Sequence, residues 1–571
     1  MLLLLGACGP TEKATVRLRT LVAGEQAPAR LELTDATGQQ IVPDDALTVA
    51  GDCGWLPVHN WVSWWAAVQL ARARDARVRD VTTGTDQFYS PGRLETSLAP
   101  GEYRLRAFKG LEYEVADTRF TVGAGEEVDV DLPLRRWIDM PAAGWLGADD
   151  HLHIPRPYRS FDLTILRWMA AEDLHVANLL QMGLAQDLHL TPQRVFGPRS
   201  VSSRGLRFVA SGQENPRTHV AGHAIILGAH EYIDFPESYL AYERFFRSAA
   251  DQGGIAGFAH WGLGGADEGL AVWAPRRLVD FVEVLGFGVP YYDSWYDLLD
   301  IGLRIAPTAG TDYPCSPYLP GRQRFYTRVE GEPTYESWLD GVERARTFVT
   351  NGPMLELEVA GSSIGGEVHL DGPSEVTVLG RVRFDPRRDD VRRLELVQAG
   401  AVVHRAGPPK RPGRLDLEVS LPLSGSTWLA LRSAGSKIGE TPLGGMQALR
   451  EALFHLPRPA ADDPFSGEGS ILEDGSVRPS AAHTAPIWVF VEGTPTLAEQ
   501  PTARAAAQRW LDLLARLESR FAPAAMAAMA GFPGRGDGLG AEDLERARGP
   551  LLDSIEATRA ELAGIIEPSE D

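Results

Sequence analysis

The chain has 571 residues, of which 44% are hydrophobic and 23% charged, and its formal net charge is -21. It is too long for one hydrophobic core and is predicted to fold as about three or four domains. The strong negative charge argues against a nucleic-acid partner, because such proteins present a basic surface to the phosphates.

The first residues form an apolar run that ends in Leu5-Gly6-Ala7-Cys8. This run resembles the lipobox of bacterial lipoproteins, in which a signal peptide is cut before a cysteine that receives lipid, although secretory signals usually span about 15–30 residues after a basic start. We predict that residues 1–12 are a lipoprotein-signal-like segment, that Cys8 is lipidated, and that the protein lies in the bacterial cell envelope. The alternative is a cytoplasmic protein with a short apolar start. No later stretch has the ~20 apolar residues of a transmembrane helix, so membrane contact is expected only through this lipid.

Residues 13–137 contain short runs in which apolar and polar residues alternate, as in Glu127–Leu132, with Gly and Pro between them. This pattern is typical of half-buried antiparallel strands and predicts an N-terminal β-sandwich. Residues 55–80 break the pattern with four tryptophans and a basic run. We predict an insertion that packs on a neighbouring part of the chain, with stacking on a sugar as the alternative.

Residues 140–350 alternate between strand-like runs and amphipathic helices, which indicates an α/β unit with a largely parallel sheet. The predicted strands are Leu174–Gln181, Leu206–Glu214, Ala224–Ala229, Gly254–His260, Val279–Leu285 and Leu303–Asp312. The predicted helices are Phe161–Glu172, Ser238–Asp251, Tyr291–Leu299 and Tyr335–Arg346. Active sites of parallel barrels form at the carboxyl ends of the strands, so polar residues at these ends are candidate site residues.

Candidate metal ligands lie at several of these ends. Asp150-His151-Leu152-His153 places two imidazoles two residues apart, so both face the same side of an extended strand. Glu214, His230, His260 and Asp312 close later strands. Imidazole and carboxylate groups suit divalent transition metals, and eight of the 13 histidines lie between residues 151 and 260. The sequence therefore predicts a metal site.

The C-terminal third returns to strands and then to helices. Residues 351–495 are predicted to form a second β-sandwich, interrupted by a long loop over Pro457–Ser480. Residues 503–567 carry two apolar helical faces separated by a Gly-rich break. They predict a helical hairpin that docks on the body, with a coiled-coil partner as the alternative. The overall expectation is a multidomain α/β + β protein.

Five motifs follow one another along the middle of the chain, namely Gly147–His153, Gly212–Glu214, Gly222–Gly228, Gly257–His260 and Ala309–Asp312. In this order they resemble the metal motifs of the polymerase-and-histidinol-phosphatase (PHP) superfamily. Three further segments are similar to its CehA/McbA branch, named for carbaryl hydrolase, namely Ala171–Leu180, Thr347–Pro353 and His483–Pro486. The resemblance implies a distorted seven-stranded (β/α) barrel that carries one to three divalent metals.

The metal ligands that this resemblance implies are His151, His153, Glu214, His260 and Asp312. For a fourth histidine, the family's spacing favours His223, whereas the rule of strand ends favours His230. We prefer His223 and keep His230 in reserve.

Two departures from the family pattern concern the number of metals. Gln181-Met182 stands where the family usually has Asp-His, and Asp312-Tyr313-Pro314 lacks a final histidine. Both missing histidines would serve a third metal, so we predict one or two ions of Zn, Mn or Fe, with Glu214 as the bridging ligand.

The predicted function is a metal-dependent hydrolase that acts on a small molecule with an ester, carbamate or phosphoester bond. A divalent ion lowers the pKa of bound water to ~7 and so supplies hydroxide at neutral pH. Asp150 is expected to orient a ligand, and Arg217 and Arg304 are candidates for stabilising the oxyanion. Five aromatic residues form either a substrate rim or core, namely Trp261, Trp273, Tyr291, Tyr292 and Trp295.

The alternative function is a lipid-anchored envelope protein that binds a glycan or a protein partner and whose barrel is degenerate. The Gln181-Met182 departure and the clustered tryptophans motivate it. The sequence indicates no oligomeric state.

Overall fold

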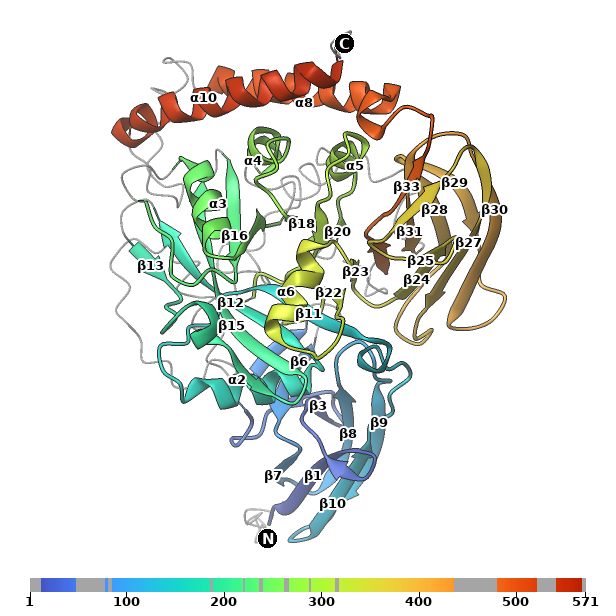
Figure 1. Cartoon of the computed structure of the whole chain (residues 1–571). Coiled ribbons are helices and arrows are strands. Elements are labelled where there is room, and N and C mark those ends of the chain that lie inside the picture. Colours follow the sequence, from blue (N-terminus) through green and yellow to red (C-terminus); the bar gives the residue numbers. More distant parts are fainter. Residues whose placement is uncertain are drawn as a thin grey trace, which may run out of the picture.

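A computed structural model describes residues 12–47, 77–80, 85–184, 188–218, 221–235, 240–260, 266–286, 289–313, 318–435, 480–520 and 541–566. Cys8, most of the tryptophan-rich stretch, Trp261 and nearly all of the predicted loop Pro457–Ser480 lie outside these residues, so the predictions for them stay predictions. The described part is a multidomain, sheet-rich α/β protein with few helices and many strands (Figure 1). None of the helices in these ranges is long and apolar enough to span a bilayer.

Two sheets make up the N-terminal unit, drawn in blue in Figure 1. The first contains β10 (Glu127–Pro133), β1 (Ala14–Val22), β2 (Glu25–Gln26) and β7 (Arg93–Leu98). The second contains β5 (Arg77–Asp80), β6 (Thr85–Ser90), β3 (Ala29–Asp35), β8 (Gly101–Phe108), β9 (Ala116–Val122) and β4 (Gln40–Ile41). Alternate residues of β1 are buried, as the period-two pattern predicts, and both sheets contribute to one hydrophobic core.

The central sheet contains seven strands. Across the sheet they follow one another in the same order as along the chain, where only short strands come between them. Its order is β21 (Ala306–Thr308), β18 (Phe281–Glu283), β17 (Ile255–Phe258), β16 (Gly222–Leu227), β15 (Arg207–Thr218), β12 (Val176–Leu184) and β11 (Trp145–Leu152). Two antiparallel strands continue it beyond β11, namely β22 (Arg324–Arg328) and β23 (Thr347–Thr350). Short strands flank it, namely β13 (Leu188–Leu190), β14 (Ser202–Arg204), β19 (Leu285–Gly286) and β20 (Val289–Pro290).

One of the seven strands runs against the others. Neighbouring pairs are parallel except β15 with β16 and β16 with β17. Only three residues separate the end of β15 from the start of β16. A link this short closes an antiparallel pair, whereas a parallel crossover needs a dozen residues or more. The expectation of a largely parallel sheet is therefore correct except at β16.

The four helices predicted in this region are present, with ends shifted by a few residues, and a fifth helix joins them. They are α2 (Phe161–Ala171), α3 (Tyr242–Asp251), α4 (Ala266–Trp273), α5 (Asp293–Asp300) and α6 (Tyr335–Glu343). In α3, Tyr242, Phe245, Phe246 and Ala249 are buried, which is the helical spacing of one apolar face. Short 3-10 turns lie at Pro141–Ala143, Gly197–Ser200 and Leu497–Glu499.

The C-terminal unit shares a sheet with the central one. Strand β32 (Ala481–Thr484) pairs with β23 on one side and with β31 (Thr427–Ala434) on the other. The sheet continues through β33 (Ile487–Val491), β26 (Glu367–Leu370), β28 (Arg393–Gln398) and β29 (Ala401–Ala406). A separate four-stranded sheet contains β25 (Ser362–Ser363), β24 (Met354–Val359), β27 (Ser374–Arg383) and β30 (Arg414–Leu423).

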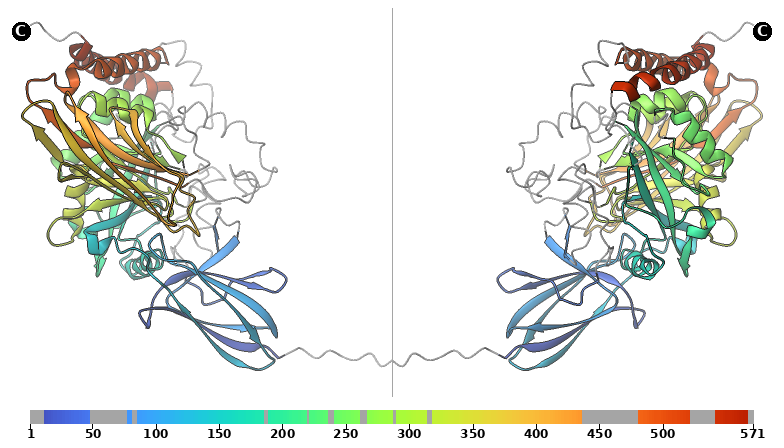
Figure 2. Two further views of the ribbon diagram at one scale, coloured as in Figure 1. Left: turned by 90° about the vertical axis from the view of Figure 1, so that its right-hand side faces the viewer. Right: turned by 90° about the vertical axis from the view of Figure 1, so that its left-hand side faces the viewer.

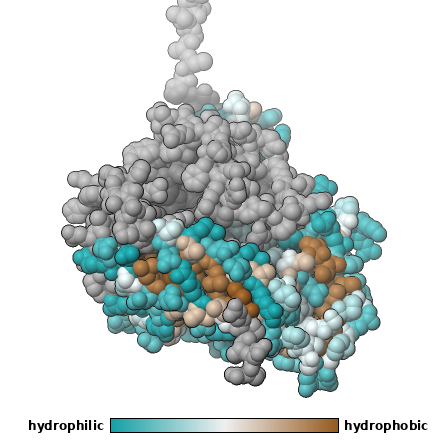
Figure 3. Space-filling model, turned by 90° about the horizontal axis from the view of Figure 1, so that it is seen from above, coloured by the Kyte–Doolittle hydropathy of each residue, from teal (hydrophilic) through white to brown (hydrophobic). Residues whose placement is uncertain are grey.

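Two C-terminal helices, α8 (Pro501–Arg520) and α10 (Ala541–Ile566), lie side by side across α4 and α5, at the end of the molecule opposite the N-terminal unit (Figures 1 and 2). Arg509 forms an ion pair with Asp297 of α5. The Thr558 hydroxyl donates a hydrogen bond to the carbonyl of Val272 in α4, at 2.5 Å. On the face seen from above, apolar residues form narrow stripes between hydrophilic ones (Figure 3).

Candidate metal centre

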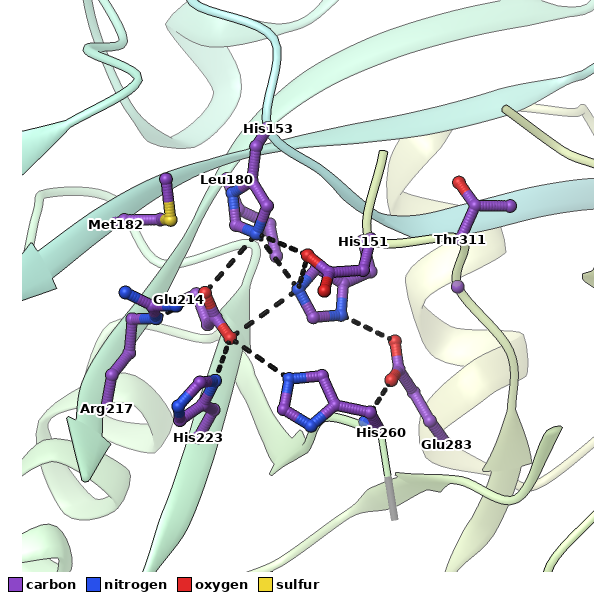
Figure 4. A network of polar contacts seen from close by, with 12 residues as sticks. His151, His153, Leu180, Met182, Glu214, Arg217, His223, His260, Glu283 and Thr311 are labelled. Carbon is purple, nitrogen blue, oxygen red and sulfur yellow. Dashed lines mark hydrogen bonds and ion pairs between the residues drawn. The ribbon is translucent and has the colours of Figure 1, made fainter. Parts of the chain in front are cut away.

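Side chains from five chain segments converge at one edge of the central sheet (Figure 4). They are His151 and His153 at the end of β11, Glu214 of β15, His223 of β16, His260 just after β17, and Asp312 after β21. Sheet register explains part of this, since Arg217 of β15 pairs with His223, and Ala224 pairs with Phe258 of β17.

His151, His153 and Asp312 form the first group of donor atoms. The two Nε2 atoms of the histidines are 3.1 Å apart. Asp312 Oδ1 lies 3.3 Å from His151 Nε2 and 3.0 Å from His153 Nε2. Both imidazoles are fully buried. Their ring nitrogens therefore face one another and the carboxylate of Asp312 away from bulk solvent.

Glu214 connects this group to two more histidines. Its Oε1 lies 2.6 Å from His223 Nδ1 and 3.6 Å from both His151 Nε2 and His260 Nε2. Its Oε2 lies 3.3 Å from His153 Nε2 and 2.6 Å from Arg217 Nε. The two oxygens of one carboxylate thus face different sets of histidines.

The electrostatics of the cluster favour ionised carboxylates. Burial alone would raise the pKa of Glu214, but the charge of Arg217, together with the contacts from the neighbouring histidines, outweighs it and holds the pKa well below its usual value. Burial lowers the pKa of His223 to about 4 even though Glu214 opposes this shift. His223 is therefore neutral near pH 7; because its Nδ1 donates to Glu214, its lone pair is on Nε2.

Two of the candidate ligands have unusual backbone conformations. His260 has φ 27° and Asp312 has φ 54°, and a side chain in this region costs on the order of 1 kcal/mol or more. The loop of Asp312 is held by Asp149, whose carboxylate accepts the amide of Thr311 at 3.0 Å, its hydroxyl at 2.6 Å and the amide of Gly321 at 2.8 Å. The surrounding structure thus maintains a locally unfavourable backbone where the donors meet.

Asp150, predicted to orient a ligand, is fully buried beside Glu283 and not in the cluster of donors. Burial, followed by the charge of Glu283, raises the pKa of Asp150 well above its usual value. A Cβ at Gly310 would lie 2.8 Å from Asp150 Oδ1 and 2.5 Å from Glu283 Oε1. Only glycine fits at residue 310, because any side chain there would collide with both carboxylates.

The structure distinguishes between His223 and His230. Because β16 runs against its neighbours, its first residues, and not its last, lie at the carboxyl ends of β15 and β17. His223 accordingly contacts Glu214, whereas His230, beyond the far end of β16, is exposed. The rule of strand ends, applied as if β16 were parallel, points to a histidine at the opposite end of β16 from the donor cluster.

This difference gives a matched pair of variants. His223→Ala is expected to weaken the binding of Zn²⁺ or Mn²⁺ by at least about 10-fold, because removing even a supporting group of a metal site costs 10- to 100-fold. His230→Ala is expected to leave the affinity unchanged. Titration against a chromophoric chelator measures both, and the reverse order of effects would exclude His223 as a ligand.

The two arginine candidates lie in different places. Arg217 is at the cluster (Figure 4), with 18% of its side chain exposed. Arg304 instead pairs with Glu367 of the C-terminal unit at 2.5 Å and lies over the ring of Trp488. Its guanidinium is held against that unit and is half exposed, so the structure does not bring Arg304 to the donor cluster.

Glu283 also belongs to this site, and it was not among the residues predicted from the sequence. It ends β18, and its Oε1 lies 3.0 Å from His151 Nδ1, while its Oε2 accepts the amide of His260. A signal for it exists in the sequence, since an acidic residue inside the apolar run Phe281–Leu285 must be buried, and buried carboxylates need partners.

The aromatic residues proposed as a substrate rim belong largely to the core. Trp273 and Trp295 are almost completely buried, and Trp273 stacks on Tyr242 at 4.6 Å between ring centroids. Tyr291 and Tyr292 are also buried. The core interpretation therefore holds for these four.

Comparison of the whole chain with protein-family models, with curated proteins and with solved structures gives no significant match.

Proposed function

We propose that this chain is a metal-dependent hydrolase similar to the CehA/McbA branch of the PHP superfamily, with the central sheet as a distorted barrel between two sandwich-like units. The observation that carries the proposal is the convergence of imidazole and carboxylate donors from four separate segments, with His223 of a fifth segment in contact with Glu214. Most contacts between donors of different segments measure 3.0–3.6 Å. Ligand atoms around a tetrahedral ion with bonds of about 2.0–2.1 Å lie about 3.3–3.4 Å apart, so the donor set fits a divalent transition metal.

The arrangement supports one or two ions of Zn, Mn or Fe. His151 belongs to two groups of donors, one with His153 and Asp312 and the other with Glu214 and His260. Glu214 is suited to bridge them because its two oxygens face different histidines. Met182, which stands where the family usually has a histidine, lies beside the cluster (Figure 4) and is buried. A thioether is a poor ligand for these ions, which disfavours a third one.

The bound metal would supply Lewis acidity and an activated water to the reaction. Arg217 is placed to contact an anionic oxygen of the substrate, since it is partly exposed and Glu214 fixes its orientation. Asp149 keeps the Asp312 loop in place. These features suit hydrolysis of an ester, carbamate or phosphoester. The alternative of a glycan- or partner-binding protein depends on tryptophans outside the described residues and on the Gln181-Met182 departure, which bears only on a third metal.

Metal removal tests the proposal. Purified protein is expected to hold one or two ions per chain, and a chelator is expected to abolish hydrolysis of a panel of aryl esters, carbamates and phosphoesters. Restoring Zn²⁺ or Mn²⁺ at 100 times its Kd should recover activity and stabilise the fold by about 2.7 kcal/mol. Elemental analysis, thermal melting and rates check this. Three tightly bound ions would refute the predicted metal number, and metal-free protein that gains no stability would refute the function.

A further inference from the structure

We propose that Glu283 is a positioning residue that holds two ligands from different strands, His151 and His260, in the orientation that a metal requires. The inference rests on the proposed metal-dependent function and adds to it a residue outside the motifs that suggested it. Glu283 is almost completely buried and lies on the opposite side of His151 from His153 (Figure 4).

The first contact fixes the imidazole of His151. Glu283 Oε1 lies 3.0 Å from His151 Nδ1, and both side chains are at most 1% exposed. A carboxylate only accepts hydrogen bonds, so Nδ1 must carry the proton. In the neutral form that would ligate a metal, the lone pair then resides on Nε2, which is the atom that faces His153, Glu214 and Asp312. A carboxylate on the second nitrogen of a ligating histidine also raises its basicity as a ligand.

The second contact fixes the backbone that carries His260. The amide of His260 donates to Glu283 Oε2, at a residue whose φ of 27° is unfavourable for a side chain. The hydrogen bond helps to retain this conformation, which directs the imidazole towards Glu214. One carboxylate therefore controls a ring orientation in one segment and a backbone conformation in another.

The fold supplies both the register and the space for this arrangement. Strands β17 and β18 are parallel, with Phe258 paired to Val282, so Glu283 follows directly beside the residues that lead to His260. On the other side, Gly310 leaves room where any side chain would collide with Glu283 and His151.

Glu283→Gln tests the proposal with little change in shape. Both partners of Glu283 are donors, whereas an amide offers one accepting oxygen and one donating nitrogen. Either one contact is lost, or His151 takes the tautomer with its proton on Nε2, the atom that would bind the metal. We expect the affinity for Zn²⁺ and for Mn²⁺ to fall by about 10- to 100-fold, measured by competition with a chelator on the full chain. Glu283→Asp keeps both acceptors but withdraws them by one methylene, and an intermediate loss is expected.

Asp280→Asn is the matched control. Asp280 precedes the same strand, and its carboxylate also accepts an amide of β17, that of Ala256 at 2.8 Å, but it lies at the other end of the strand from the cluster. We expect this variant to keep the wild-type affinity, and the metal-free melting temperatures of the two isosteric variants to be similar.

The outcomes separate the two proposals. Wild-type protein that binds no metal refutes the proposed function and this inference together. Wild-type protein that binds metal while Glu283→Gln binds it equally well refutes only the role of Glu283. An equal loss of affinity in Asp280→Asn and Glu283→Gln also refutes that role, because it would reflect general weakening of the β17–β18 pair. If Glu283→Gln does not fold, Glu283→Asp decides in the same way.

Discussion

Replacing His151 and His153 together by alanine is expected to lower kcat/KM by about a thousandfold or more, which corresponds to about 4 kcal/mol of transition-state stabilisation. The two imidazoles supply the donor atoms nearest to Asp312 and to one oxygen of Glu214. Their loss removes two of the imidazoles that would share an ion with these carboxylates, so both metal affinity and the reaction that depends on it should fail.

A second double variant controls for the loss of histidines as such. His369 and His404 lie on exposed positions of β26 and β29 in the C-terminal unit, and replacing both by alanine should leave rates unchanged. Rates are measured on the same ester, carbamate and phosphoester panel, with circular dichroism to show that both variants fold. Equal rates in the wild type and in the His151/His153 variant would end the metal-hydrolase interpretation.

The sequence predicted the local elements well because they depend on local periodicity. Alternation in Ala14–Val22 and the apolar face of Tyr242–Asp251 are visible without any tertiary information. The donors His151, His153, Glu214, His260 and Asp312 were also identified, because each lies at or near the end of a predicted strand, and these ends meet at one edge.

The direction of β16 was the main error, and its consequence was the ambiguity between His223 and His230. Periodicity does not reveal strand direction. The length of the link indicates it, since the predicted strands Leu206–Glu214 and Ala224–Ala229 leave only nine residues between them, fewer than the dozen or more of a parallel crossover. Loop length would therefore have favoured His223 from the sequence.

Other features depend on contacts between distant parts of the chain and have no local signal. From the sequence, Arg304 is a candidate site residue. In the structure its guanidinium pairs with Glu367 and lies over the ring of Trp488, both in the C-terminal unit. The continuous sheet across the central and C-terminal units depends on β32 pairing with β23, more than 130 residues away. The boundary near residue 351 therefore marks a change in the sequence pattern, although the hydrogen-bonded sheet continues across it.

The junction between the N-terminal and central units contains a buried ion pair. Arg30 of β3 and Glu172, just after α2, are 2.7 Å apart with 1% and 3% of their side chains exposed. The hydroxyl of Tyr89 in β6 donates to the same carboxylate at 2.6 Å. Burial, followed by the charge of Glu172, raises the pKa of Tyr89 well above its usual value, so Tyr89 stays protonated as the donor.

Glu172→Gln is expected to lower the free energy of unfolding by about 3–5 kcal/mol, because it removes the charged partner that the buried guanidinium of Arg30 contacts at 2.7 Å. Asp117→Asn is the control in the same unit. It removes the partner of Arg104 from a pair whose side chains are 44% and 40% exposed, and it should cost only about 0–1 kcal/mol. Urea unfolding of the full chain measures both. If the two variants lose the same stability, the buried pair does not hold the N-terminal unit to the central sheet, and the apolar contacts around Tyr89 must carry that junction instead.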